Sequence, residues 1–67
     1  MTRQPVISSI MRSVGWSRNI LEIEFNDGSI YQYFNVTFSE YNSFINSTSL
    51  GSALSKLDKI HTYTRVY

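Results

Sequence analysis

The chain has 67 residues, a net charge of +1, one histidine and no cysteine, and 42% of its residues are hydrophobic and 16% charged. A chain of this length forms one domain that buries only about 60% of its unfolded surface, so a deep, water-excluding active site is not expected. The apolar content excludes a disordered chain, and the absence of cysteine excludes disulfides, Cys-ligated zinc and thiol chemistry.

Residues 1–6 are expected to form an N-terminal arm, which contains the one proline, Pro5. No apolar run of signal-peptide length follows this arm, and none in the chain approaches the roughly 20 residues of a membrane span. Together with the missing cysteines, this predicts a cytoplasmic protein with no membrane partner.

The first predicted strand lies within residues 7–16. Ile10, Val14 and Trp16 recur at even spacing, and Ser13 and Gly15 have the opposite parity. Residues 17–19 are expected to form a three-residue turn.

The clearest strand follows at residues 21–25, where apolar residues alternate with Glu22 and Glu24. Asp27-Gly28 then predicts a two-residue hairpin turn into a strand at residues 30–34. In that register Tyr31 and Tyr33 share the more solvent-exposed face of the sheet with the two glutamates. A register shift of one residue would instead place the tyrosines on the core face. The residues expected to face the core are Leu21, Ile23, Phe25, Ile30 and Phe34.

Two helices are predicted next. Thr37 and Glu40 have the spacing of a capping box, which begins a helix from about residue 38 to 46. Residues 47–49 end it and offer an N-cap to a second helix. The expected apolar stripes are Phe38, Tyr41, Phe44 and Ile45 on the first helix and Leu50, Ala53, Leu54, Leu57 and Ile60 on the second.

Residues 61–67 alternate again, which leaves open a short final strand at the edge of the sheet. The predicted fold is therefore a single α+β domain over residues 1–67. It has a three-stranded antiparallel meander, two helices packed on one face, and room for a short C-terminal strand.

Catalysis has little support in the sequence. His61 is the one side chain with an ordinary pKa near neutrality, and Asp58 lies one helical turn before it, but no activated nucleophile accompanies them. The three glycines are isolated, so no phosphate-binding loop is predicted, and one histidine without cysteine does not supply the usual ligands of a metal. We expect a protein that is not an enzyme and has no metal or cofactor.

The charges are unevenly distributed. Both ends of the chain are basic and the middle contains most of the acids. If the ends meet in space, cations and tyrosines would form a modest surface for nucleic acid. The charges alone favour an ordinary solvated surface over this one, because six basic residues are balanced by five acids. The candidate residues are Arg12, Lys56, Lys59 and Arg65 for phosphates and Tyr63, Tyr31 and Tyr33 for stacking on bases.

Several short motifs, taken in order, resemble the KTSC domain, a small module named for its occurrence at the C-terminus of lysyl-tRNA synthetases and found widely in bacterial and phage proteins. The matching segments are Ser8-Ser9-Ile10, Ser13-Val14-Gly15-Trp16, residues 21–25, residues 27–33, Val36, Tyr41, Phe44 and Ser49-Leu50-Gly51. The family features that carry over are Ser13, Gly15, Tyr31, Tyr33 and Ser49. After Gly51 the chain departs from the family pattern, because the usual aromatic pair and asparagine are absent.

The resemblance implies a non-catalytic RNA-binding or nucleic-acid-binding domain, of phage, prophage or bacterial type, whose partner is RNA or another single-stranded nucleic acid. The alternative is a protein-interaction module, either a phage factor that acts on a host protein or a domain that associates with itself. A Tyr and Glu face and an unpaired strand edge would serve that alternative.

Overall fold

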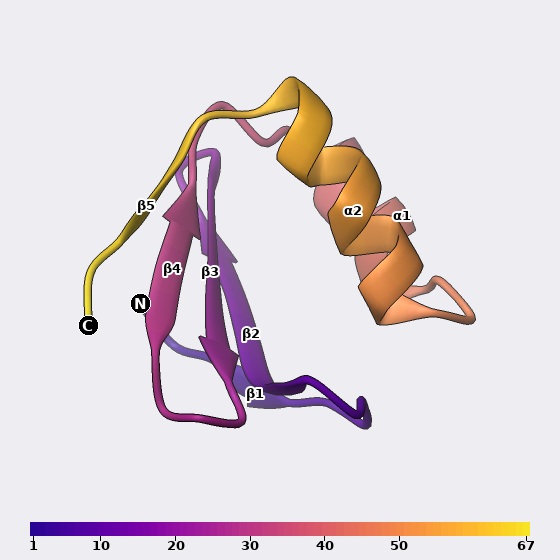
Figure 1. Cartoon of the computed structure of the whole chain (residues 1–67). Coiled ribbons are helices and arrows are strands. Elements are labelled where there is room, and N and C mark those ends of the chain that lie inside the picture. The colour runs from indigo at the N-terminus through magenta and orange to yellow at the C-terminus, as the bar shows by residue number, and fades with distance from the viewer.

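The computed structural model describes residues 1–67 as one five-stranded antiparallel sheet with two helices on one of its faces (Figure 1). The strands follow the order of the chain, β1-β2-β3-β4-β5. The elements are β1 (Gln4–Pro5), β2 (Met11–Ser17), β3 (Ile20–Phe25), β4 (Ile30–Tyr33), α1 (Phe38–Ile45), α2 (Leu50–Ile60) and β5 (Tyr63–Arg65). Neither helix has the length and apolar character needed to cross a membrane.

Four strands precede the helices, one more than the predicted three. The additional strand is β1, a two-residue edge strand in which Gln4 pairs with Val14 and Pro5 with Ser13. The short final strand exists, because β5 pairs antiparallel with β4. The α+β class, the meander and the helices after it are therefore confirmed, and the sheet is wider than the hydrophobic pattern indicated.

The hairpin between β2 and β3 is tighter than expected. Ser17 pairs with Ile20 across a two-residue turn, and both Arg18 and Asn19 have positive φ, 51° and 64°, as a type I′ turn requires. A register shift between Met11 and Ser13 interrupts the pairing of β2 with β3. This bulge adds one residue to β2 and so interrupts the alternation of its side chains between the two faces of the sheet. Met11 and Val14 are therefore both buried although they are three residues apart.

The hairpin between β3 and β4 differs from the prediction by one residue. Phe25 is bonded to Ser29, since its N–H donates to the Ser29 carbonyl at 2.8 Å, and the loop contains three residues with Gly28 at a φ of 90°. Leu21 consequently lies opposite Tyr33 and Glu24 opposite Ile30. The predicted faces of β4 were wrong: the tyrosines share the core face with Leu21, Ile23 and Phe25, and Ile30 lies on the other face.

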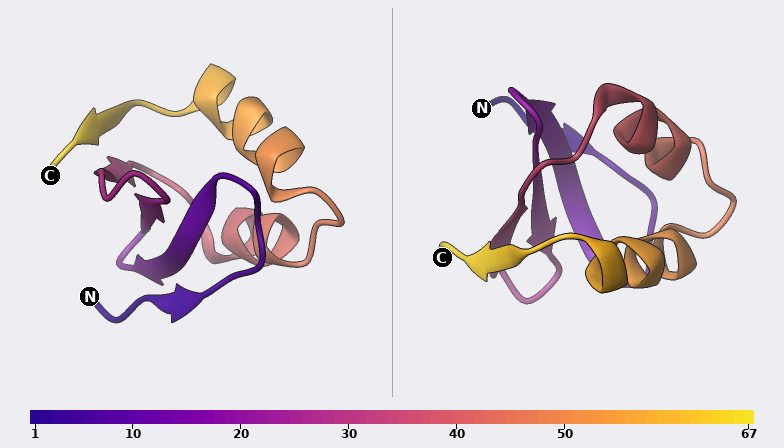
Figure 2. Two further views of the ribbon diagram at one scale, coloured as in Figure 1. Left: turned by 60° about the horizontal axis from the view of Figure 1, so that its bottom comes forward. Right: turned by 90° about the horizontal axis from the view of Figure 1, so that it is seen from above.

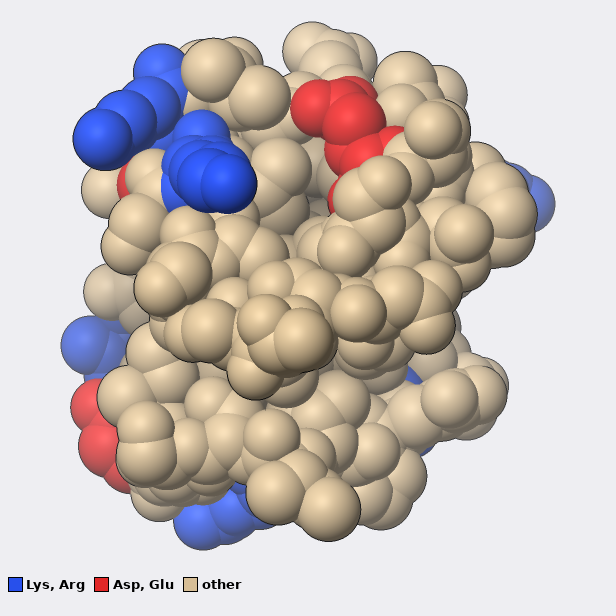
Figure 3. All heavy atoms as spheres, turned by 90° about the vertical axis from the view of Figure 1, so that its right-hand side faces the viewer, with Lys and Arg blue, Asp and Glu red and all other residues tan.

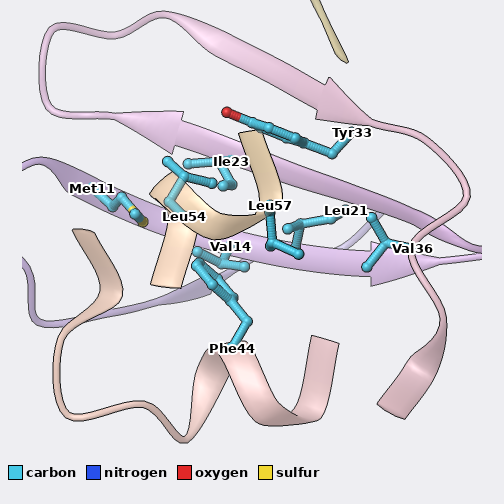
Figure 4. Close-up of a cluster of buried hydrophobic side chains, with 9 residues drawn as sticks. All are labelled: Met11, Val14, Leu21, Ile23, Tyr33, Val36, Phe44, Leu54 and Leu57. Atoms are coloured by element: carbon cyan, nitrogen blue, oxygen red, sulfur yellow. The ribbon is translucent and has the colours of Figure 1, made fainter. Parts of the chain in front are cut away.

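Both helices begin where the sequence predicts. Thr37 and Glu40 form the capping box, and the Ser49 hydroxyl accepts the N–H of Ser52. The two helices lie on the same side of the sheet (Figure 2), and their buried residues, Phe44, Leu54 and Leu57, meet the sheet in the core (Figure 4). Ile60 is 68% exposed and does not belong to the inner face, because α2 ends there.

Trp16 fixes the position of α1. Its Nε1–H donates to the Val36 carbonyl oxygen at 2.8 Å, and its ring stacks on Tyr41 at 6.0 Å and meets Phe38 edge-on at 5.4 Å. Phe38 is thus held by an aromatic contact although more than half of it is exposed.

The N-terminal arm runs across Gly15. A Cβ atom at this position would lie 2.6 Å from the Thr2 carbonyl oxygen, which is closer than two such atoms can approach. Gly15 is therefore required because backbone occupies the space of a side chain.

We predict that Gly15→Ala displaces residues 2–5 and lowers the free energy of unfolding by about 1–3 kcal/mol, the usual cost of overpacking. Urea denaturation measures the stability, and faster hydrogen exchange at Val14 would report loss of β1. Gly51→Ala is the matched control, since its Cβ would meet only Ile10 Cδ1 at 3.7 Å in ordinary contact. Equal stability of Gly15→Ala and the parent protein would contradict this account.

Candidate nucleic-acid interface

Three tyrosines cluster at the β4–β5 edge of the sheet. Tyr33 lies opposite Tyr63 across the two strands, and Tyr31 lies opposite Arg65. The ring of Tyr63 is 5.0 Å from that of Tyr33 and 6.1 Å from that of Tyr31, measured between centroids. Phe25 extends the cluster, since its ring meets Tyr31 edge-on at 5.5 Å. The edge therefore holds a continuous row of aromatic rings.

The three tyrosines differ in exposure. Tyr63 is 49% exposed and Tyr31 is half-buried, so a flat molecule can reach the outermost ring. Tyr33 is only 3% exposed, and its hydroxyl donates to Asp58 Oδ1 at 2.7 Å. Burial, reinforced by this carboxylate, raises the pKa of Tyr33 well above its ordinary value. Tyr33 is therefore a core residue that supports Tyr63, and its ring is buried in this structure, whereas a stacking residue needs an exposed face.

A groove of about 600 Å³ opens beside the tyrosine cluster, between the sheet and α2. Its lining combines aromatic rings with two carboxylates and contains no Lys or Arg. The lining residues are Ser9, Ile10, Phe25, Asn26, Asp27, Ser29, Tyr31, Tyr33, Leu54, Asp58 and Tyr63. We call this the tyrosine groove.

Three of the four predicted phosphate-binding residues lie in the C-terminal part of the chain. Lys56 and Lys59 are exposed on α2, and Arg65 is exposed on β5, where its Nε–H donates to the Tyr67 carbonyl at 2.8 Å. Figure 3, which looks onto the helical side of the molecule, shows Lys or Arg side chains gathered at one corner of a mostly uncharged surface.

Arg12 does not join these cations. It lies on β2, which β3 and β4 separate from β5, and strands are spaced about 4.8 Å apart. Its guanidinium contacts Glu24 Oε2 at 3.4 Å and donates to the Asn26 carbonyl at 3.1 Å. Arg65 therefore lies beside the tyrosines at the β4–β5 edge, Lys56 and Lys59 lie on α2, and Arg12 lies apart from them on β2.

A second groove, of about 570 Å³, lies between α1 and α2 and was not predicted. Hydroxyl groups dominate its lining, and Lys56 and Glu40 supply the charges. The Ser and Thr residues concerned are Ser39, Ser43, Ser47, Thr48, Ser49 and Ser52. The recurrence of Ser39, Ser43 and Ser47 every four residues is the sequence signal that could have shown a row of hydroxyls along α1 and just past its C-terminal end.

The sheet face that the helices do not cover is a polar network. Glu22 is 8% exposed, and its carboxylate accepts hydrogen bonds from Gln32 at 2.8 Å and from the Arg3 guanidinium. Burial alone would raise the pKa of Glu22, but these two partners outweigh it and hold the pKa below its ordinary value. The predicted face of Tyr and Glu was wrong, because the glutamates share their face with Gln32 and Arg3 instead.

His61 joins three elements. Its Nδ1 lies 2.9 Å from the Phe34 carbonyl oxygen, and its Nε2 lies 2.7 Å from Glu40 Oε2. The Phe34 carbonyl and the Glu40 carboxylate are both acceptors, so whichever ring nitrogen carries a proton has an acceptor within hydrogen-bond distance. The Thr37 N–H and then His61 lower the pKa of Glu40. His61 thus ties the end of α2 to α1 and β4, and Asp58, its expected neighbour, bonds to Tyr33 instead.

Comparison with known proteins gives the same family by two routes. The family model of the KTSC domain matches residues 7–61. The crystal structure of a KTSC domain protein from Yersinia pestis superposes with a TM-score of 0.89 at 30% sequence identity, covering 98% of this chain and 97% of that one. A search of the curated proteins gives no match.

The buried Glu22 network makes stability depend on pH in acid. Because the folded protein lowers the pKa of Glu22, the unfolded chain binds more protons as the pH falls, and stability decreases from about pH 5 downward. We predict that Glu22→Gln is less stable than the parent at neutral pH and loses less stability between about pH 5 and about pH 3. Urea midpoints across this range measure both effects, and parallel curves for the two proteins would contradict the prediction.

Proposed function

Because the chain belongs to the KTSC domain family, we propose that it is a small non-catalytic domain that binds single-stranded nucleic acid, with RNA as its principal ligand. The observation that carries this proposal is the composition of residues 56–67. This segment contains Lys56, Lys59 and Arg65 against one carboxylate, Asp58, and it holds the most exposed ring of the tyrosine cluster. We place this activity in the cytoplasm, whether the protein is of bacterial or phage origin.

Tyr63 would be the stacking platform. Its ring is half exposed and is backed by Tyr33 and Tyr31, so little side-chain entropy remains to be lost when a base stacks on it. Stacking of one base on an aromatic side chain contributes roughly 1–3 kcal/mol and tolerates any sequence. Tyr31 packs against the Tyr63 ring, and the buried ring of Tyr33 supports it from beneath.

Lys56, Lys59 and Arg65 would contact phosphates on either side of that platform. All three are exposed, and none of them forms a salt bridge. The hydroxyls of the groove between the helices, which Lys56 also lines, are donors of the kind that phosphate oxygens accept. Three such contacts on a single strand give a log–log salt slope of about −2, so binding is weak at physiological salt.

The outer edge of β5 favours a second candidate function, addition of a strand from another protein. Its three residues, Tyr63, Thr64 and Arg65, are all exposed, and β5 is the last strand of the sheet. A strand of a host protein, or of a second copy of this chain, could pair with its free backbone groups. Pairing of this kind is insensitive to salt, which distinguishes it from phosphate binding.

The test of nucleic-acid binding is a titration of a short labelled oligouridylate and the corresponding DNA, followed by fluorescence anisotropy at about 20 mM and about 150 mM salt. We predict that Tyr63→Ala weakens RNA binding about 5- to 100-fold. Replacing both Lys56 and Lys59 by Gln is expected to weaken binding and reduce the salt slope by about 1.4.

Arg12→Gln is the matched control for the lysines, because Arg12 lies away from the interface, and it is expected to leave the affinity unchanged. Tyr63→Phe keeps the ring and is expected to bind as the parent does. Absence of binding to either oligonucleotide at high micromolar protein in low salt would refute the proposal. A larger particle in light scattering that persists in high salt would favour the β5 edge instead.

A further inference from the structure

The tyrosine groove has the size and walls of a small-molecule site. Its volume of about 600 Å³ falls within the usual range for ligand pockets. Tyr31 and Tyr63 supply aromatic walls, and Leu54 from α2 and Phe25 from β3 supply apolar surface. A flat aromatic ligand matches such a lining better than a flexible chain does, because ring stacking adds to the burial of apolar area.

The charged groups of the groove are carboxylates. No Lys or Arg lines it, so a phosphate group is repelled from its interior. The two carboxylates differ in their partners. Asp27 Oδ1 accepts both the N–H and the hydroxyl of Ser29 within the β3–β4 turn, and Arg65 acts on it electrostatically. Asp58 accepts one hydrogen bond, from Tyr33, and so retains acceptor capacity.

The ligand must therefore be aromatic, without a phosphate in the groove, and able to donate hydrogen bonds to a carboxylate. Among the unpaired bases of a single strand, guanine meets this need best. Its N1–H and N2 amino group are adjacent donors on the Watson–Crick edge, which match the two oxygens of a carboxylate. Adenine and cytosine present one amino donor beside a ring acceptor, and the N3–H of uracil lies between two carbonyls that a carboxylate repels.

The groove is continuous with the surface proposed for RNA. Tyr63 lines the groove, and Arg65, two residues further along β5, acts electrostatically on Asp27 of the groove. A nucleotide whose base enters the groove thus keeps a phosphate near the Arg65 guanidinium.

We propose that the tyrosine groove is a nucleobase pocket that selects guanine in single-stranded RNA, with Tyr31 and Tyr63 stacking on the base and the Asp58 carboxylate accepting its N1–H and N2–H groups. This rests on the proposed function, because it specifies which base the same surface prefers.

The test compares oligouridylates that differ only at one central nucleotide, titrated by fluorescence anisotropy in low salt. Replacing the central uridine by guanosine is expected to tighten binding about tenfold. Inosine, which lacks only the N2 amino group, is expected to give an intermediate affinity. 7-Deazaguanosine keeps the Watson–Crick edge and is expected to bind as guanosine does.

Asp58→Asn tests the acceptor. The asparagine carbonyl still accepts the Tyr33 hydroxyl, but the carboxylate is lost, so the preference for guanosine over uridine is expected to fall to less than threefold. Glu24→Gln is the matched control, since it removes one negative charge on the opposite face of the sheet and is expected to retain the preference. Circular dichroism melting confirms that each variant folds, and the base analogues test the pocket with the parent protein alone.

The outcomes separate the two proposals. Equal affinity for the uridine and guanosine oligonucleotides overturns the guanine pocket and leaves RNA binding in place. Weak binding of the 7-deaza analogue also overturns it, because the base would then be recognised through its other edge. Failure of every oligonucleotide to bind overturns both proposals, and binding of an oligolysine peptide in their place would assign the groove to a basic protein segment.

Discussion

The three-residue turn at Asn26-Asp27-Gly28 is the constraint on which the rest of the molecule depends. Gly28 adopts a φ of 90°, and the Asp27 carboxylate accepts two hydrogen bonds from Ser29, and these features hold the loop in its three-residue form. This turn sets the register of β4 on β3. The register in turn places Tyr31 and Tyr33 beneath α2 and Gln32 beside Glu22, and it thereby creates both the aromatic edge and the polar face.

Local signals in the sequence were sufficient to predict the helices and strands, but they did not determine the register in which the strands pair. Capping residues such as Thr37 and Ser49 act within one helical turn, and the alternation at residues 21–25 is strong, so helices and strands were predicted near their observed bounds. Two-residue and three-residue loops both suit Asn-Asp-Gly-Ser, and the hydrogen bonds from Ser29 to Asp27 that hold the three-residue form are seen only in the structure. The bulge at residues 11–13 and the pairing of β1 likewise depend on contacts distant in sequence.

Part of the candidate site followed from the sequence, because Lys and Arg side chains are charged and almost always exposed. Lys56, Lys59, Arg65 and Tyr63 are exposed, as a candidate interface requires. The burial of Tyr33 and the separation of Arg12 from β5 could not be predicted, because they depend on the strand register and on the strand order. The tyrosine groove could not be predicted at all, since it exists only where α2 passes over the sheet.

The crossing of the N-terminal arm over Gly15 changes which positions of the fold are free to vary. The outward face of a sheet packed on one side is ordinarily its most tolerant surface, because its side chains meet only water. Here that face is covered at β2 by backbone and by the Arg3 guanidinium, which bonds to both Glu22 and Ser13. Central β2 is therefore constrained on both faces, and we expect related sequences to vary less at its outward positions than at the exposed face of α2.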